Sequence, residues 1–310
     1  MATAVATRRA GPLGGRTIVR GRQVRQAVGV GILLVLLAVV WEAVKWLGGD
    51  PWRVNTQVFG LPVQFMHQPP FEWRIASDIA LPHLWTIVGA FGEISAGTGQ
   101  PLALVLFDSA IYTLRTAAIG FTVGVALGLL LGIAFVHSRL LERALVPWVV
   151  ASQTVPIIAI APVVVVAFGA SWQSVAIIAT YLTFFPVTIA MIRGLRAFDP
   201  RAGELMRSYA ASTREVLWKL RMPASVPYLF AALRVAAAGS IVGTIIGELP
   251  SGIPFGLGSK ILSFNQYYTT SPARLWATII ATVLTGLVFV GLVRLAEVLL
   301  TRGRYRRVED

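Results

Sequence analysis

The sequence contains no cysteine among its 310 residues, and only 13% of them are charged. Without cysteine, the chain can form no disulfide, no thiolate nucleophile and no cysteine-based metal site. Hydrophobic residues make up 56% of the chain, and the mean hydropathy of +0.72 is too high for an ordinary soluble globular protein. The composition therefore predicts an integral membrane protein.

Sequence motifs of catalysis and cofactor binding are also missing. The glycines at 252–258 do not form a phosphate-binding loop, because no Gly-Lys-Ser/Thr follows them and Ser259 precedes Lys260. The three histidines lie far apart without metal-ligand spacing, and the sequence has neither a Gly-x-Ser-x-Gly elbow nor a glycosidase-like carboxylate pair. We therefore expect no catalytic residue, no metal and no cofactor in this chain, and a membrane-embedded enzyme is disfavoured.

Six stretches are apolar enough to cross a hydrocarbon core about 30 Å thick, which requires roughly 20 helical residues. They cover approximately 27–47, 109–136, 146–168, 174–192, 224–248 and 275–300. Most of the 27 lysines and arginines lie in the two terminal segments and in 137–145 and 193–223, so the positive-inside rule places both termini in the cytoplasm. The predicted fold class is an all-α integral membrane protein with six transmembrane helices.

The segments outside these spans differ in character. Residues 1–26 carry arginines and no acid, which predicts a disordered basic cytoplasmic tail; a nucleic-acid-binding or lipid-headgroup arm is the alternative. A first transmembrane helix at 27–48 leads into an extracytoplasmic segment, 49–108. We expect residues 50–80 to form a solvated loop and residues 81–93 to form an amphipathic helix at the outer membrane interface. A membrane core at 109–301 and a cytoplasmic tail at 302–310 complete the predicted organisation.

Glycine spacing within two spans indicates close helix packing. Gly120, Gly124, Gly128 and Gly132 recur at four-residue intervals, as do Gly239, Gly243 and Gly247. A stripe of this kind lets a neighbouring backbone approach closely. Static packing is the favoured interpretation, and sliding of the helices during opening is the alternative.

The third span is interrupted by prolines, each of which removes a helical hydrogen bond. Irregular backbone at membrane depth is tolerated only against protein or a water-filled path, so we expect this span to face a translocation route; a kinked helix packed in protein is the alternative. Glu248 is a further candidate for the route, although a structural pair or a solvent-facing helix end is favoured for this carboxylate. The candidate path residues are Ser152, Gln153, Thr154, Pro156 and Glu248.

Residues 199–223 form the one long polar segment between apolar spans, and they predict two short helices. Asp199 can cap the first helix, with Pro200 at its first position. Ser212 and Glu215 fit a capping box at the start of the second helix, which Pro223 is expected to end. Apolar residues at near-helical spacing alternate with arginines, a pattern typical of a surface that binds a membrane or a partner.

The spacing of Glu204, Ala210 and Pro223 resembles the EAA motif, E-A-A-x3-G-x9-I-x-L-P, of the permease subunits of binding-protein-dependent ABC importers. Leu205 and Met206 replace the two alanines, and Ala210 replaces the glycine. The proline-rich third span and the sequence around 81–93 are similar to those of nitrate, sulfonate and taurine importer permeases.

This resemblance implies the type I ABC importer permease (MetI-like) fold in a bacterial inner membrane, with 199–223 as a cytoplasmic coupling segment. The implied partners are two ATPase subunits that bind the ATP, an extracytoplasmic solute-binding protein, a second copy of the permease and membrane lipid, but no nucleic acid. Glu204 is expected to anchor the docked segment through an arginine of the ATPase. The residues assigned to ATPase coupling are Glu204, Arg207, Tyr209, Ala210, Ala211, Ser212, Glu215 and Pro223.

The expected cargo is a small solute, either a sulfonate- or nitrate-like anion or a compound related to pyrimidines and vitamin precursors. A secondary transporter driven by an ion gradient is the alternative function. Such transporters usually show buried carboxylates and broken helices in matching repeats, whereas here only Glu248 qualifies and no internal repeat is evident.

Overall fold

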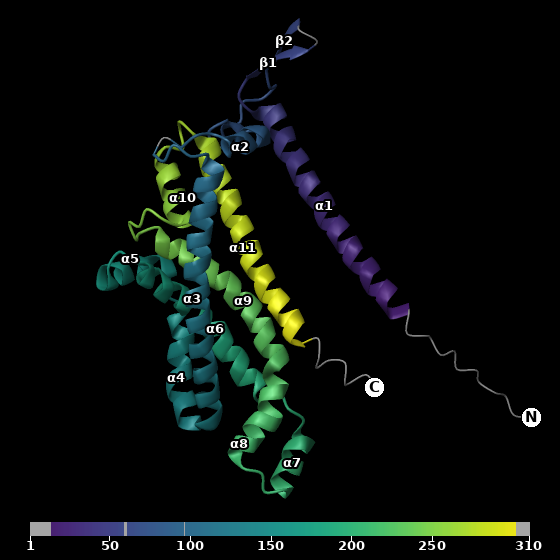
Figure 1. Ribbon diagram of the computed structural model, residues 1–310, viewed down its shortest axis with the longest axis vertical. Coiled ribbons are helices and arrows are strands. Elements are labelled where there is room, and N and C mark those ends of the chain that lie inside the picture. The colour runs from purple at the N-terminus through teal and green to yellow at the C-terminus, as the bar shows by residue number, and fades with distance from the viewer. Residues whose placement is uncertain (1–13, 59–60, 96, 302–310) are drawn as a thin grey trace, which may run out of the picture. The chain divides into compact units, whose positions relative to one another are not determined.

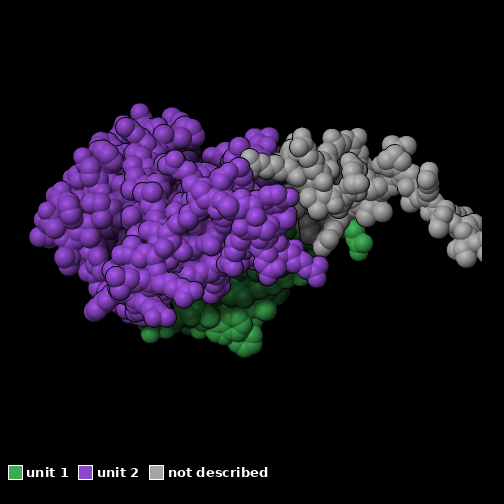
Figure 2. Space-filling model, turned by 90° about the horizontal axis from the view of Figure 1, so that it is seen from below, with its two compact units in different colours: residues 1–87 green, residues 88–310 purple. Residues whose placement is uncertain are grey.

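The computed structural model describes residues 14–58, 61–95 and 97–301, and the chain divides into two compact units, residues 1–87 and 88–310 (Figure 1; Figure 2). The structure is mostly helical, as predicted. Among the described residues, five helices are long and apolar enough to cross a membrane, and a bent pair of helices brings the possible number to six. The predicted tails at 1–13 and 302–310 lie outside the described residues.

The first unit is built on α1 (Gly14–Gly48), whose apolar side chains from Val28 onward are largely exposed, as expected of a helix surrounded by lipid. Because α1 begins at Gly14, the prediction of a disordered tail is wrong for residues 14–26. The solvated loop expected at 50–80 is also wrong in part. Here β1 (Trp52–Val58) and β2 (Leu61–His67) form an antiparallel hairpin that pairs Trp52 with His67, followed by the short helix η1 (Arg74–Ala76).

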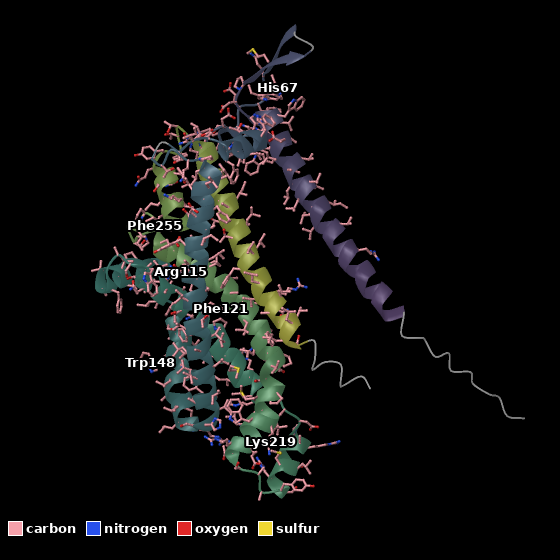
Figure 3. The ribbon with its side chains drawn as sticks, in the orientation of Figure 1. His67, Arg115, Phe121, Trp148, Lys219 and Phe255 are labelled. Carbon is pink, nitrogen blue, oxygen red and sulfur yellow. The ribbon has the colours of Figure 1, made fainter. Side chains whose placement is uncertain are left out.

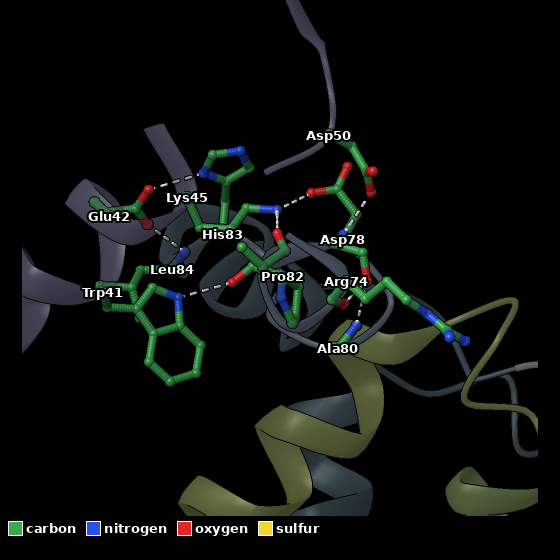
Figure 4. Close-up of polar contacts among 12 residues, drawn as sticks. Trp41, Glu42, Lys45, Asp50, Arg74, Asp78, Ala80, Pro82, His83 and Leu84 are labelled. Atoms are coloured by element: carbon green, nitrogen blue, oxygen red, sulfur yellow. Dashed lines mark hydrogen bonds and ion pairs between the residues drawn. The ribbon is translucent and has the colours of Figure 1, made fainter. Parts of the chain in front are cut away.

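Polar contacts attach the end of α1 to the segment that follows the hairpin (Figure 4). The carboxylate of Glu42 accepts hydrogen bonds from the backbone N–H of Leu84 at 2.7 Å and contacts His83 Nδ1 at 2.8 Å. Lys45 is fully buried and pairs with Asp78 while donating to the carbonyl of Ala76. A buried ammonium requires such partners. Helix α2 (Leu84–Ala90) follows directly, inside the range 81–93 predicted to be helical.

The second unit contains the remaining helices. In chain order they are α3 (Leu102–His137), α4 (Arg139–Ser152), α5 (Ile157–Phe168), α6 (Trp172–Gly194), α7 (Pro200–Ser208), α8 (Thr213–Glu215), the π-helical turn η2 (Val216–Arg221), α9 (Met222–Glu248), α10 (Leu257–Gln266) and α11 (Pro272–Thr301). Within this unit, α7 and α8 lie at one end and α10 lies at the opposite end (Figure 1). Helix α3 starts at Leu102, before the predicted core boundary at 109.

Helix α6 packs between the two glycine stripes. A Cβ atom at Gly124 would lie 2.5 Å from Thr183 Cβ, and one at Gly128 would lie 2.7 Å from Val187 Cβ, so α3 approaches α6 more closely than side chains allow. On α9, a Cβ at Gly243 would lie 3.0 Å from Cα of Ala179. The packing predicted from the glycine spacing is therefore present, and α6 is its shared partner.

The third predicted span differs from a simple helix. Helices α4 and α5 meet at an angle of 99° across residues 153–156, so the stretch 146–168 is a sharply bent pair. Helix α4 also begins at Arg139, inside the segment 137–145 that we expected to be a cytoplasmic connection. Within the described chain, no residue of α4 is buried, and Ala161 is the one buried residue of α5.

Candidate functional site

The polar segment predicted as two helices begins with a capped helix, α7. The side chain of Asp199 accepts a hydrogen bond from the backbone N–H of Arg201 at 2.9 Å, and Pro200 occupies the first helical turn. The cap accepts from a backbone N–H of the first turn, which has no carbonyl partner within the helix. Proline is tolerated at the first position because the N–H that it lacks would have no helical partner either. The start of α7 therefore follows the prediction.

Helix α7 ends in a tight turn at the position of the motif glycine. Ala210 has φ of 52°, in the left-handed region. The N–H of Ala211 donates to the carbonyl of Met206 at 3.0 Å, and the N–H of Ala210 donates to the carbonyl of Arg207 at 2.9 Å. This pair of hydrogen bonds is the Schellman ending, which normally uses glycine. Ala210 thus makes the sharp bend at an energetic cost that glycine would avoid.

A capping box starts the second helix. The N–H of Glu215 donates to Ser212 Oγ at 3.3 Å, while the Glu215 carboxylate accepts from the N–H of Ser212 at 3.0 Å. Lys219 Nζ lies 2.8 Å from the same carboxylate. These contacts confirm the predicted capping box and occupy Glu215 within its own helix.

The expectation that Pro223 ends this helix is wrong. Helix α8 continues through η2, where the N–H of Met222 donates to the carbonyl of Leu217, five residues earlier. Pro223 lies in the first turn of α9, which then extends to Glu248. The wider π turn leaves room for a proline that would otherwise clash with the preceding turn. The second helix of the segment is therefore continuous with a membrane span.

Exposed residues on this end of the unit form the candidate coupling surface, which we define as Glu204, Leu205, Arg207, Tyr209 and Trp218. Leu205 is 57% exposed, Tyr209 77% and Trp218 60%, and Glu204 and Arg207 are also exposed. Lys219, the neighbour of Trp218, lies at this end of the second unit (Figure 3). Trp218 was not predicted, although a tryptophan in a polar segment was a usable signal.

The α6–α7 connection is tied to α4 by an ion pair. Arg196 Nη2 lies 2.6 Å from Glu142 Oε2. Hydrogen bonding to this carboxylate raises the pKa of the Arg196 guanidinium above its ordinary value.

The candidate path residues on the third span all lie at the bend between α4 and α5. Ser152 Oγ donates to the carbonyl of Val149 at 2.8 Å, and Thr154 Oγ1 donates to the carbonyl of Ala151 at 2.7 Å. Pro156 forms the N-cap of α5, and the carbonyl of Ser152 accepts a hydrogen bond from Tyr181 on α6. These side chains add hydrogen bonds to carbonyls at the end of α4, where the carbonyl of Ala151 also accepts from the backbone N–H of Thr154 at 3.0 Å. Gln153 contacts Ser152 Oγ at 3.4 Å and completes the bend.

Glu248 lies elsewhere and is fully buried. Its carboxylate accepts hydrogen bonds from Thr113 Oγ1 on α3 at 2.8 Å and from the N–H of Gly258 at the start of α10 at 2.7 Å. The N–H of Leu257 donates to Thr113 Oγ1 as well. The carboxylate thus joins three helices and complements the positive end of α10. This arrangement favours the structural interpretation of Glu248 and does not bring it together with the bend.

Arg234, on the fifth predicted span, pairs with Glu297 of α11 at 3.4 Å. An arginine within a membrane span needs such a partner or must extend its charged end to the membrane surface, and here it has the partner.

Comparison with known proteins assigns the family. The protein family described as the binding-protein-dependent transport system inner membrane component matches residues 124–301, a range that contains the coupling surface and the bend. The chain belongs to this family. The permease is a multi-pass membrane protein of the type I ABC importer class, as the resemblance implied.

Two curated relatives are similar to this permease. The formylaminopyrimidine transport permease protein of Halalkalibacterium halodurans is 36% identical over 44% of this chain and 54% of its own length, so the match spans about half of that relative. The putative aliphatic sulfonates transport permease protein of Bacillus subtilis is 28% identical over 71% of this chain and 83% of its own.

A solved structure confirms the fold. The crystal structure of an amino acid ABC transporter with histidines superposes with a TM-score of 0.52 at 15% identity, covering 63% of this chain and 94% of that chain. At this identity the likeness supports the fold of the permease and nothing more specific.

Proposed function

We propose that this permease forms the translocation path of an ABC importer in a bacterial inner membrane. In this proposal two copies pair in the membrane, an extracytoplasmic binding protein delivers the solute, and two separate ATPase subunits bind and hydrolyse ATP. Membership of the binding-protein-dependent family supports these partners. The nearly unburied helix α5 and the broken backbone before it support a second copy, because irregular backbone at membrane depth is tolerated only against protein or a water-filled path.

The coupling surface is the single observation that carries the proposal. It places a carboxylate and three large apolar side chains on α7, which is capped at both ends, and on the turn η2 that follows the capping box of α8. Large aromatic side chains exposed on a rigid element are typical of binding hot spots. We assign this surface to docking on the ATPase, with Glu204 paired to an arginine of that subunit.

The coupling segment is connected to a membrane span by a continuous helix. Because α8, η2 and α9 form one unbroken helical rod from Thr213 to Glu248, a displacement of the docked end moves the fifth span with it. Closure of the ATPase dimer would then draw the two coupling segments together and reopen the path outward, an alternating-access cycle driven by rigid elements.

Charge reversal at Glu204 tests the coupling role. Glu204→Arg should abolish ATP-driven uptake in vesicles while leaving membrane insertion intact, because the arginine would face the arginine of the ATPase. Glu72→Arg, the same change at an exposed carboxylate outside the segment, should transport normally. Full uptake by the Glu204 variant would refute the assigned role.

Single-cysteine labelling tests the orientation. The chain has no cysteine of its own, so Ser208→Cys introduces a unique thiol at the end of α7. We expect both termini and this thiol in the cytoplasm, where a membrane-impermeant maleimide reacts only after the cells are permeabilised. Labelling of intact cells would overturn the orientation and the ATPase contact together.

We propose a small anionic or heteroaromatic solute as the cargo, either sulfonate- or nitrate-like or related to pyrimidines and vitamin precursors. The names of the two relatives support these two classes. Identification of the ligand that co-purifies with the binding protein encoded beside this chain would decide between them. Loss of uptake on adding a protonophore, with ATP present, would instead favour a gradient-driven transporter.

A further inference from the structure

A groove of about 820 Å³ lies between the start of α4, the α6–α7 connection and η2. We call it the basic groove, because four arginines and one carboxylate supply all of its charged side chains. Its lining residues are Val136, Arg139, Glu142, Arg143, Val146, Pro147, Arg196, Phe198 and Arg221.

The arginines of the groove have more positive charge than the described residues neutralise. Glu142 pairs with Arg196, which leaves three guanidiniums. Among the described residues, Arg139 and Arg143 have no hydrogen-bond or ion-pair partner within contact distance, and the first turn of α4 adds the positive end of a 14-residue helix. The groove is therefore a concentrated site of unbalanced positive charge.

Arg221 is held in place but incompletely bonded. Its guanidinium carbon lies 5.4 Å from the centre of the Phe198 ring, a cation–π arrangement that orients the side chain. Its Nε is buried and has no hydrogen-bond acceptor among the described residues. A buried donor without an acceptor costs free energy, so this nitrogen is positioned for an acceptor that the described part of the chain does not supply.

The outer face of α4 distinguishes between possible anions. Leu140 is 78% exposed and Trp148 is 74% exposed, and Figure 3 shows Trp148 on the side of α4 that faces away from the other helices of the unit. Tryptophan gathers where lipid headgroups meet acyl chains. A ligand that fits both features has a phosphate for the guanidiniums and hydrocarbon for the adjacent face. A carboxylate on the polar surface of an ATPase could pair with the guanidiniums, but it offers no hydrocarbon for the exposed face of α4.

We propose that the basic groove binds the phosphate of an anionic phospholipid of the inner leaflet, with its acyl chains along the exposed face of α4. Basic pockets between helices on the cytoplasmic side of a membrane are suited to such headgroups. The inference rests on the cytoplasmic orientation proposed above. A bound phosphate would bridge α4 and η2, the turn that links the coupling segment to α9.

Native mass spectrometry of the purified full-length permease, with and without short-chain phosphatidylglycerol, tests the proposal. We expect retained phosphatidylglycerol and no retained phosphatidylcholine. Arg139→Gln with Arg143→Gln should weaken binding roughly 5-fold for each guanidinium removed, about 30-fold together. Arg139→Lys with Arg143→Lys should keep most of the binding. The matched control, Arg201→Gln with Arg214→Gln, removes two exposed arginines outside the groove and should bind as the wild type does.

Three results would overturn the proposal. Equal retention of the two lipids would show that no anionic headgroup is recognised, and unchanged binding in the double glutamine variant would place the lipid elsewhere. Retention of inorganic phosphate equal to that of phosphatidylglycerol, measured in the same way, would assign the groove to a free anion. None of these measurements involves an ATPase or transport, so the lipid site can fail while the proposed function stands, and the labelling of Ser208→Cys tests the orientation separately.

Discussion

Replacing Gly124 of α3 with alanine should lower the stability of the permease, because α6 leaves no space for a methyl group at this position. The added Cβ would lie 2.5 Å from Thr183 Cβ, 2.7 Å from its Cγ2 and 2.9 Å from the carbonyl oxygen of Thr180. One of these neighbours is backbone, so a rotamer change cannot relieve the clash and the helices must separate. Overpacking of this kind costs about 1–3 kcal/mol. For a domain of this size that corresponds to a melting temperature lower by roughly 2–12 °C.

The matched control is Gly291→Ala on α11, since a Cβ there would meet no atom within 4 Å. This variant should be as stable as the wild type or slightly more stable, because alanine favours helix over glycine by about 1 kcal/mol. Thermal unfolding of both variants in the same detergent, followed by tryptophan fluorescence, gives the comparison. If Gly124→Ala melts with the wild type and its control, the close approach of α3 and α6 is not a source of stability and the argument from the glycine stripe fails.

Three further changes test individual contacts. Ala210→Gly should stabilise the turn after α7 by about 1 kcal/mol, because glycine adopts a φ of 52° without penalty, and hydrogen exchange of the α7 amides should slow accordingly. Glu248→Leu should lower the melting temperature by several degrees, since each buried donor left without an acceptor costs about 1–3 kcal/mol; lost uptake at an unchanged melting temperature would instead place the carboxylate in the path. Arg234→Glu should reduce the yield of folded protein, and adding Glu297→Arg should restore it; if the reversed pair fails to rescue, the 3.4 Å contact is incidental.

Local signals predicted most of the coupling segment. Asp199, Ser212 and Glu215 act through hydrogen bonds to backbone groups within three residues. Short sequence patterns are therefore enough to predict their roles. The five long spans followed in the same way from length and hydropathy. The glycine stripes were predictable as interfaces, whereas the identity of their shared partner, α6, depends on the fold.

Features that depend on competition between distant groups were missed. Proline normally ends a helix, and the sequence gives no sign that η2 would widen and carry the helix past Pro223. The hairpin at 52–67 was also missed, although the sequence carried a signal for it. Within 52–58, apolar residues and a threonine alternate with Arg53, Asn55 and Gln57, a pattern typical of a half-buried strand. The basic groove joins residues from 136 to 221, and only the fold brings these arginines together.

The same geometry constrains how motion can pass through the permease. Helix α6 is held against α3 and α9 by glycine contacts on two sides, so a shift of α9 alone would open gaps or force overlaps along its own stripe against α6. The three helices are therefore expected to move together as one body. The bent pair α4 and α5 makes two polar contacts with α6 and its C-terminal connection, Tyr181 with the carbonyl of Ser152 at the break and Arg196 with Glu142 on α4, and has little buried surface of its own. Relative movement during a transport cycle is consequently easiest between this pair and the three-helix body, and the bend at 153–156 is where it would be absorbed.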